Sequence, residues 1–232
     1  SQLSGIKDDI NEQISQSVDI ANSIAVRLNT LNGQIANSVM NGETPNDLLD
    51  SRDLLLDQLS EIGDITVTKR GATGAIDIKL GDNTIVGQDV VHALSDTSSV
   101  TGGSLGALVQ LGDTSGDNAS SVQYYMDKLD TLAAGVAKSV NEIHLNGINL
   151  EGKSGAENTG AEFFVSNDGE EISAANITVN SAIQKDVSKI AASDEENNLT
   201  GNGDVALAIA KLKTASSLSD STTDTTTKTI DS

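Results

Sequence analysis

The sequence pattern closest to a catalytic motif is the stretch GINLEGKS, which begins at Gly147 and ends at Ser154. It matches G-x-x-x-x-G-K-[ST], the P-loop pattern in which backbone amides cradle phosphates, the lysine contacts the terminal phosphates and the last hydroxyl binds magnesium. A P-loop needs a buried strand before it and a helix directly after it. Here a long helical pattern precedes the match, a Gly-rich stretch follows it, and Glu151 adds negative charge where phosphates would lie. We therefore interpret the match as a coincidence.

Histidine chemistry is limited to His92 and His144, the only histidines in the chain. Glu142 lies two residues before His144, and residues two apart on a helix point to different sides, so they are not a preformed pair of base and orienting group. We expect His144 to be a surface or helix-end histidine. No histidine stands at a spacing that would activate a nucleophile, and the calcium loop D-x-[DN]-x-[DN]-G does not occur. The acidic runs at 194–196 and 220–224 are interpreted as solvated loops.

The composition excludes further function classes. The chain has 14 Lys and Arg against 34 Asp and Glu, a net charge of −20, which disfavours a nucleic-acid partner because such binding needs a basic patch. No cysteine is present, so disulfides, thiol nucleophiles and Cys-based metal sites are excluded. No apolar run approaches the length of a membrane span, and the first residues do not resemble a signal peptide.

Aromatic residues make up only 2% of the chain. Its core must therefore be built from Leu, Ile, Val and Ala, which favours helices packed along seams over an aromatic-centred enzyme core. We predict a protein that is not an enzyme, with no catalytic residue, no cofactor and no metal ligand.

Long helical patterns must carry the structure. Apolar residues three or four apart run through residues 3–35 and predict one long amphipathic helix that ends near Asn41 and Gly42. A second helix is predicted over residues 46–62, with Thr44 as its N-cap and Gly63 after its end.

A third long helix is predicted over residues 122–143, where the apolar residues have the same period as in the first. Shorter helices are predicted at 105–111 and 205–212. The apolar faces of these two long helices are suited to antiparallel pairing within the chain, although pairing between chains would use the same pattern.

Between residues 64 and 94 the apolar period changes to two, with Gly-rich turns at 71–74 and 81–83, which predicts a small antiparallel sheet. Residues 163–165 and 176–179 are predicted to be short buried strands, and residues 182–192 a short helix.

The predicted fold class is α+β and mainly helical, an elongated rod of long amphipathic helices with a small antiparallel β subdomain. We assign the helical rod to residues 1–62, 104–146 and 203–219, and the β subdomain to residues 63–103. Residues 147–202 are predicted to be a loop-rich segment with short strands, and residues 220–232 a frayed tail.

Several segments, taken in order along the chain, resemble one protein family. They are NDLLDSRDLLLDQLS (46–60), AIDIKLGDNTIVGQDVVHAL (75–94), GGSLGALVQL (102–111), NEIHLNGINLEGKSGAE (141–157) with the following FF (163–164), AANITVN (174–180), IAAS (190–193) and GDVALAIAKL (203–212). The chain resembles the bacterial flagellar hook-associated protein 1 family, the first of two junction proteins between hook and filament. In that family the segment around residues 147–154 is a helix end followed by a loop, which accounts for the P-loop match.

The resemblance implies a structural protein of the extracellular bacterial flagellum that joins hook to filament after export through the flagellar type III channel. It implies as partners neighbouring copies of the chain, the hook protein, the second hook-filament junction protein, and an export chaperone that binds a terminal helix. The family's terminal helices, which carry most polymerising contacts, have no counterpart in this sequence. We therefore expect a central fragment that is monomeric and binds neither nucleic acid nor membrane.

Two alternatives remain open. A secreted adhesin or coiled-coil interaction module also fits an acidic, Cys-free chain with long helices, and it would form stable dimers or trimers. A P-loop NTPase using the stretch from Gly147 to Ser154 would be stabilised by magnesium-nucleotide, and Lys153→Ala would abolish that stabilisation.

Overall fold

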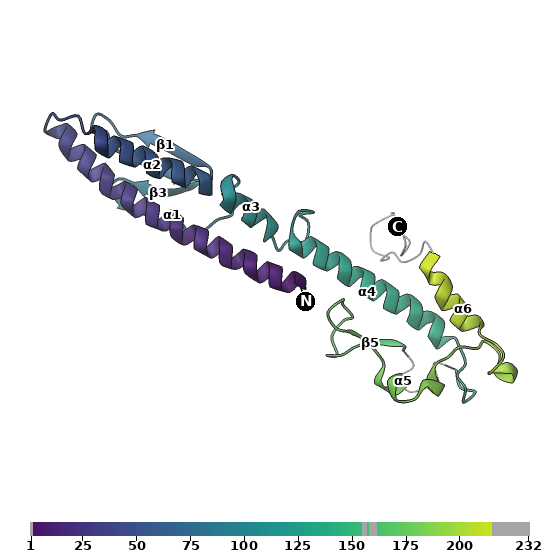
Figure 1. The fold of residues 1–232 in the computed structure, drawn as a ribbon. Coiled ribbons are helices and arrows are strands. Elements are labelled where there is room, and N and C mark those ends of the chain that lie inside the picture. Colours follow the sequence, from purple (N-terminus) through teal and green to yellow (C-terminus); the bar gives the residue numbers. More distant parts are fainter. Residues whose placement is uncertain (1, 155–156, 158–161, 215–232) are drawn as a thin grey trace. The chain divides into compact units, whose positions relative to one another are not determined.

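The computed structural model describes residues 2–154, 157 and 162–214 (Figure 1). The fold is α+β and mainly helical, as predicted, and it divides into two compact units with the boundary after Tyr124. The helices and strands before this boundary are α1 (Gln2–Met40), α2 (Asn46–Ile62), β1 (Ile65–Lys69), β2 (Ile76–Leu80), β3 (Asn83–Gly87), β4 (Val90–Val91) and α3 (Gly103–Leu111). The elements that follow are α4 (Val122–Leu145), β5 (Phe164–Ser166), β6 (Ile177–Val179), α5 (Ser181–Lys185), η2 (Val187–Lys189), η3 (Glu196–Asn198), α6 (Asp204–Lys211) and η4 (Leu212–Thr214). The predicted assignment of separate chain segments to one rod stays a prediction, as does its elongated shape.

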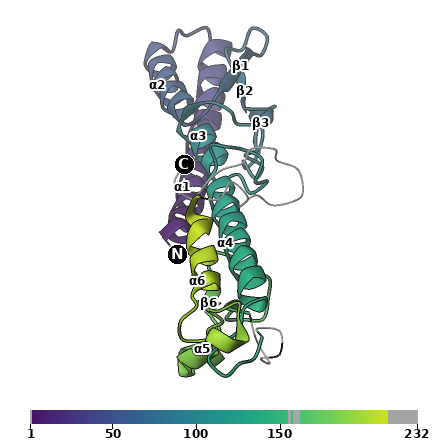
Figure 2. The same cartoon turned by 90° about the vertical axis from the view of Figure 1, so that its right-hand side faces the viewer.

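In the first unit, α1 lies beside α2 and also contacts α3, β3 and β4 (Figures 1 and 2). One apolar core joins the helices to the inner face of the sheet. Its fully buried members include Leu28 of α1, Leu59 of α2, Ile78 and Leu80 of β2, and Leu105 of α3. The apolar stripe of α1 is thus covered by α2, α3 and the sheet. Such packing is what stabilises a long amphipathic helix in water.

The predicted antiparallel sheet is present as a four-stranded meander in the order β1-β2-β3-β4. Along β2 the side chains alternate, with Ile76, Ile78 and Leu80 buried and Asp77 and Lys79 on the outer face. This period of two is the pattern expected for a sheet with one face on the core and one toward water.

The end of α2 agrees with the sequence prediction, but its start does not. Gly63 follows the helix, and its N–H donates to the carbonyl of Leu59 at 3.1 Å. Thr44 was predicted as N-cap, whereas Pro45 occupies that position and no side chain caps the helix. The carbonyl of Thr44 accepts from the N–H of Asn46 at 3.0 Å, so the chain turns tightly one residue later than the Thr-Pro pattern suggested.

In the second unit, α6 runs beside α4, and β5 pairs antiparallel with β6 (Figures 1 and 2). The buried side chains of α4 are Ala137, Val140, Asn141 and His144, all in its C-terminal half. The other buried apolar side chains described in this unit are Ile183, Ala191 and Val205, so this half of the helix belongs to the core of the unit.

The continuous helix predicted over residues 182–192 is wrong. The structure has α5 and then the separate 3-10 turn η2, with Asp186 between them in an extended conformation (φ −147°, ψ 97°). The Asp186 carboxylate accepts from the N–H of Ser188 at 3.0 Å, and this competing local hydrogen bond ends the helix. The predicted last helix is present as α6, while residues 215–219 of the predicted rod and the tail at 220–232 lie outside the described residues.

Candidate functional site

The P-loop-like stretch forms a tight turn around the side chain of Asn149, which is almost fully buried. The Asn149 Oδ1 accepts from the backbone N–H groups of Glu151 and Lys153, each at 3.0 Å. The N–H of Gly152 donates to the Asn149 carbonyl at 3.0 Å. The amides that a P-loop would direct at phosphate oxygens are therefore already bound within the turn.

Other parts of this turn also differ from a nucleotide site. The Lys153 Nζ lies 3.1 Å from the Glu151 carboxylate, so the cation is paired with an acid of its own loop. The element before the turn is α4, which ends at Leu145, and no strand leads into it. The geometry offers no cradle for phosphate.

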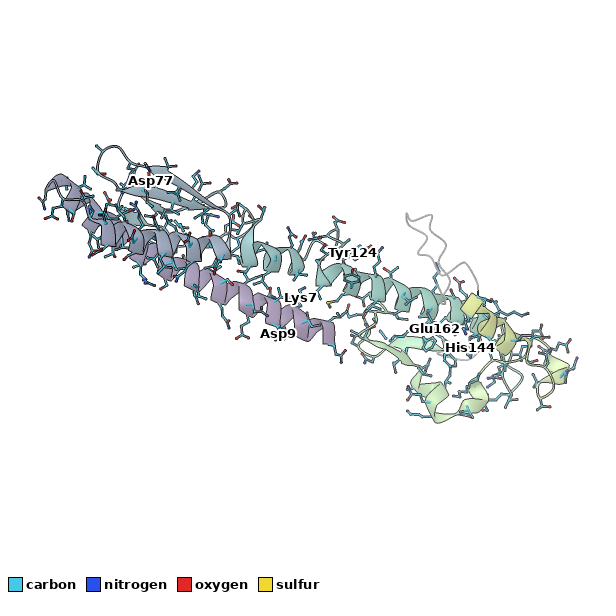
Figure 3. All side chains as sticks on the ribbon, turned by 45° about the horizontal axis from the view of Figure 1, so that its top comes forward. Lys7, Asp9, Asp77, Tyr124, His144 and Glu162 are labelled. Atoms are coloured by element: carbon cyan, nitrogen blue, oxygen red, sulfur yellow. The ribbon has the colours of Figure 1, made fainter. Side chains whose placement is uncertain are left out.

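Of the two positions expected for His144, surface or helix end, the structure shows the second, because the residue lies in the last turn of α4 (Figure 3). It is not a surface residue, because its exposed fraction is 0%. Its Nε2 accepts from the N–H of Ala191 at 3.0 Å, and its ring meets Phe163 edge-on with 5.5 Å between centroids. An imidazole nitrogen that accepts a hydrogen bond is unprotonated, so this residue is a neutral packing and hydrogen-bonding group. Its burial follows from the segment around Ala191 folding back onto the helix end.

Two asparagines, which the sequence analysis did not single out, bind the backbone of distant strands at two points each. Asn32 of α1 donates from Nδ2 to the Ile76 carbonyl at 2.7 Å and accepts at Oδ1 from the Ile76 N–H at 3.2 Å. Asn141 of α4 does the same with Phe164, at 2.8 and 2.9 Å. A side-chain amide used in this way replaces a neighbouring strand, and each fixes where a strand lies on a helix.

Asp64 joins the start of β1 to the start of α3. Its Oδ1 accepts from the N–H groups of Thr101 at 3.0 Å and Gly102 at 3.1 Å. The Gly102 hydrogen bond, with that of Thr101, outweighs the opposing effect of burial and lowers the pKa of the Asp64 carboxyl below its usual value. The ionised carboxylate is thus the form that stabilises this junction.

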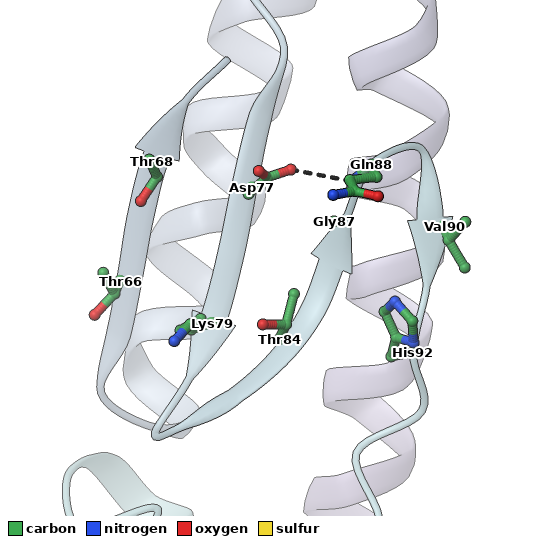
Figure 4. A pocket seen from close by; sticks show the side chains of 9 residues that line it. All are labelled: Thr66, Thr68, Asp77, Lys79, Thr84, Gly87, Gln88, Val90 and His92. Atoms are coloured by element: carbon green, nitrogen blue, oxygen red, sulfur yellow. Dashed lines mark hydrogen bonds between the residues drawn. The ribbon is translucent and has the colours of Figure 1, made fainter.

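The outer face of the sheet forms a shallow polar hollow (Figure 4). It is lined by Thr66, Thr68, Asp77, Lys79, Thr84, Gly87, Gln88, Val90 and His92. Asp77 is already engaged, because its Oδ1 accepts from the Gln88 N–H at 3.2 Å and lies 3.1 Å from Nε of Arg70. The threonine hydroxyls come from β1 and β3, Lys79 comes from β2 and His92 follows β4. Within the described residues no hydrogen bond pairs one of these hydroxyls with Lys79 or His92 as a base.

Arg70 also binds Asp89 at the β3–β4 turn, with 2.7 Å between Nη2 and Oδ1. The hydrogen bond from Arg70, together with its charge, lowers the pKa of the Asp89 carboxyl, and the same hydrogen bond raises the pKa of the Arg70 guanidinium. Because Asp89 is exposed, this ion pair shapes the turn but adds little stability.

A second hollow, between α4 and α6, is almost entirely apolar. Its lining comprises Val136, Val140, Phe163, Phe164, Ala206, Ile209, Ala210, Leu212 and Lys213. We refer to it as the α4–α6 groove. It contains one charged side chain and no converging polar groups, so it fits an apolar surface better than a reacting substrate.

Across the described ranges, no cluster of three His, Asp or Glu side chains could hold a metal ion. In the same ranges, no helix combines the length and the apolarity needed to cross a membrane.

Comparison with known proteins gives a consistent result. Residues 1–97, and again residues 91–164, match the family described as the flagellar hook-associated protein FlgK helical domain. Flagellar hook-associated protein 1 of Bacillus subtilis (strain 168) is 28% identical over 197 residues, which cover 67% of this chain and 38% of that protein.

Among solved structures, the flagellar hook junction protein FlgK from Burkholderia pseudomallei has a similar fold. The TM-score is 0.57 at 22% identity, and the match covers 71% of this chain and 32% of that one. The chain thus corresponds to less than two fifths of either relative's length.

Proposed function

We propose, because this chain belongs to the family of the flagellar hook-associated protein FlgK helical domain, that it is a structural segment of the junction between the flagellar hook and filament. The observation that carries the proposal is the family match, which extends without a gap from α1 to the end of α4. The names of the Bacillus and Burkholderia relatives, a hook-associated protein and a hook junction protein, support the same role.

The geometry supports a structural role over an enzymatic one. The P-loop-like turn binds its own amides, and His144 is buried and occupied by a backbone N–H. Catalysis requires a positioned nucleophile, base or metal that a substrate can reach. We propose that the protein is not an enzyme and that its surface serves to contact other subunits.

The first unit has the features of a stiff strut. The helix α1 has 39 residues, about 58 Å at 1.5 Å per residue, and it is fastened at intervals along its length. Near its start, Lys7 Nζ donates to Gln123 at 2.7 Å; further on, Asn22 accepts from the N–H of Leu94 at 2.7 Å, and Asn32 binds Ile76. A helix held to its neighbours at separated points transmits force along its axis instead of bending freely. A part that couples rotation of the hook to the filament needs this property.

We further propose that the protein acts outside the cell, after export through the flagellar channel. Its partners would be neighbouring copies, the hook protein and the second junction protein, with an export chaperone before assembly. The family membership supports these assignments, and a chain free of cysteine fits passage as an unfolded polypeptide.

Deleting the gene for this chain in its own bacterium tests the proposal. The expected result is cells that keep their hooks but have no attached filaments and release filament protein into the medium. Cells with normally attached filaments would refute the junction role.

Location is tested separately with Glu43→Cys, an exposed turn position in a chain that has no other cysteine. In complemented cells a thiol-reactive dye should mark one spot at the base of each filament. Label spread along the filament or over the cell body would contradict the proposed position.

A further inference from the structure

The chain contains four Asn-Gly pairs, at residues 32–33, 41–42, 146–147 and 202–203. In such a pair the backbone nitrogen of the glycine can attack the side-chain carboxamide of the asparagine, because glycine has no Cβ that hinders the approach. The attack requires a glycine N–H that is free to lose its proton and a carboxamide held close to that nitrogen. The four pairs share this chemistry, so the fold decides which of them can react.

Three of the pairs hold the glycine nitrogen in a backbone hydrogen bond. Gly33 lies inside α1, where its N–H belongs to the helical hydrogen-bond ladder. The N–H of Gly42 donates to the Val39 carbonyl at 3.0 Å, and the N–H of Gly147 donates to the His144 carbonyl at 3.1 Å. Each of these nitrogens must leave its hydrogen bond before it can attack, which makes the reaction slower.

The fourth pair, Asn202-Gly203, lies directly before α6 and differs from the others. Within the described residues the N–H of Gly203 makes no hydrogen bond. Gly203 is also exposed to solvent, so water and hydroxide can remove its proton. This nitrogen therefore needs no opening of the structure before it reacts.

The carboxamide of Asn202 is folded back toward this nitrogen. Its Oδ1 accepts from the N–H of Asp204 at 2.9 Å, which closes a local turn around the Gly203 nitrogen. Its Nδ2 donates to the carboxylates of Asp194 at 2.8 Å and Asp204 at 3.3 Å. These contacts fix the orientation of the carboxamide, and the Asp204 N–H lies where negative charge would develop on Oδ1 during an attack.

The same two carboxylates oppose the reaction through their charge, because they disfavour loss of a proton from the Gly203 nitrogen. Asp194 and Asp204 are both exposed, so water and salt screen this effect. The free N–H and the held carboxamide are therefore the features that distinguish this pair from the other three.

We propose that Asn202 is a site of spontaneous deamidation. The deprotonated nitrogen of Gly203 forms a bond to Cγ of Asn202, the bond from Cγ to Nδ2 breaks, and the side-chain nitrogen takes up a proton and leaves as ammonia. Water then opens the resulting succinimide ring at one of its two carbonyl carbons. The product is aspartate or isoaspartate at position 202, and water is the only co-reactant.

Deamidation replaces a hydrogen-bond donor by a negative charge, so the net charge changes from −20 to −21. The new carboxylate faces that of Asp194, and the hydrogen bond that ties this acid to the residues before α6 is lost. In the isoaspartate form the backbone also gains one methylene group ahead of the helix. The N–H of Val205 still donates to the Ala192 carbonyl at 3.1 Å, so we expect the loop over residues 194–202 to loosen while α6 stays folded.

Incubation of the purified chain in warm neutral buffer, followed by mass spectrometry of its peptides, measures the reaction at each of the four pairs. In the folded chain Asn202 should react at least about fivefold faster than each of the other three asparagines, the factor that corresponds to breaking one ordinary hydrogen bond. In concentrated urea the four sites should react at similar rates, because unfolding removes the contacts that distinguish them. The product at position 202 should include isoaspartate, which marks the succinimide route.

Gly203→Ala tests the role of the free nitrogen. A Cβ at this position has nothing within 4 Å, and the backbone at φ −129° suits alanine, so the fold is kept while the methyl group hinders the attack. Product at Asn202 should be lost over the time in which the native chain is half converted. The matched control is Gly33→Ala, whose Cβ also has nothing within 4 Å, and it should leave the rate at Asn202 unchanged.

Two results would overturn the proposal. One is a rate at Asn202 in the folded chain that is no higher than the rate at Asn41, the other exposed asparagine before a glycine in a turn. The other is conversion of Asn202 at the native rate in Gly203→Ala, which would show that the glycine nitrogen is not the attacking group. The inference concerns the chemistry of this chain and does not rest on the proposed junction role.

Discussion

Replacing Asn32 by alanine should destabilise the first unit far more than a single polar-to-apolar change on a helix normally does. In the β1–β2 ladder the N–H of Arg70 donates to the carbonyl of Ala75 at 2.8 Å. Because backbone groups alternate in direction along a strand, those of Ile76 point away from β1. On its other side β2 pairs with β3 only from Ile78 to Leu80, so β3 does not reach Ile76. The side chain of Asn32 instead binds both the N–H and the carbonyl of Ile76.

The size of the effect follows from what is left behind. In Asn32→Ala the N–H and the carbonyl of Ile76, a residue that is 2% exposed, both lose their partners. An unsatisfied buried polar group costs about 1–3 kcal/mol, so two cost about 2–6 kcal/mol, offset by up to about 0.7 kcal/mol of better helix propensity. We expect a loss of about 3 kcal/mol in the free energy of unfolding and a fall of about 10 °C in the unfolding midpoint.

The control is Asn11→Ala, because Asn11 is exposed on the same helix and its side chain makes no hydrogen bond within the described residues. It should leave stability unchanged or raise it slightly. Urea unfolding followed by circular dichroism gives the free energies, and hydrogen exchange at the Ile76 amide reports the local effect. If Asn32→Ala and Asn11→Ala differ by less than about 1 kcal/mol, or exchange at Ile76 is unchanged, the reasoning about the buried amide is wrong.

Three further predictions address other parts of the molecule. Asp64→Ala should lower the free energy of unfolding by about 1 kcal/mol at pH 7, as for loss of a capping carboxylate. Because the pKa of Asp64 is lowered in the folded state, its carboxylate stabilises the fold fully above its ordinary pKa of about 3.9. This stabilisation is lost as the pH falls through the lower pKa of the folded state. Urea titrations from pH 7 to pH 2 should show the two proteins converging in acid, and a constant difference would contradict the role of the ionised carboxylate. Gly63→Ala should lower the free energy of unfolding by about 1–3 kcal/mol, because the added Cβ would lie 2.7 Å from Leu80 Cδ1. Gly33→Ala should raise it by up to about 1 kcal/mol, because nothing lies within 4 Å of that Cβ. Equal changes of the two variants in thermal unfolding would contradict this steric argument. Magnesium-ATP should shift the unfolding midpoint of neither the native protein nor Lys153→Ala, and a shift that the substitution abolishes would restore the nucleotide site.

The long elements of the fold could be predicted from the sequence because their signals repeat many times. In α1 the apolar period continues from residue 3 to residue 35, about nine helical turns, and in β2 the alternation of Ile76, Ile78 and Leu80 with polar residues is unbroken. The family resemblance seen in the segments around α2 and α4 is confirmed by the family match. These features depend on local patterns, which a sequence contains in full.

The tertiary hydrogen bonds could not be predicted in the same way. Asn32 lies among Leu28, Leu31 and Ile35 on the core-facing side of α1. In the sequence, its polar amide only interrupts the run of apolar residues. Its partner is 44 residues away, and only the packing of β2 on α1 brings the two together. Similarly, the burial of His144 depends on the segment at Ala191. An asparagine or histidine at a core-facing helical position is the available signal, and it indicates a buried partner without naming it.

The two long helices show what a periodic pattern leaves undetermined. Both α1 and α4 have apolar residues at intervals of three and four, and in both a buried asparagine binds the backbone of a strand. In the first unit the stripe of α1 is covered by α2, α3 and the sheet, whereas Leu129 and Leu132 of α4 remain about half exposed. An apolar periodicity indicates that one face of a helix is packed against a neighbour. It does not indicate whether that neighbour belongs to the same molecule. The difference in exposure between these two helix faces is therefore visible only in the structure.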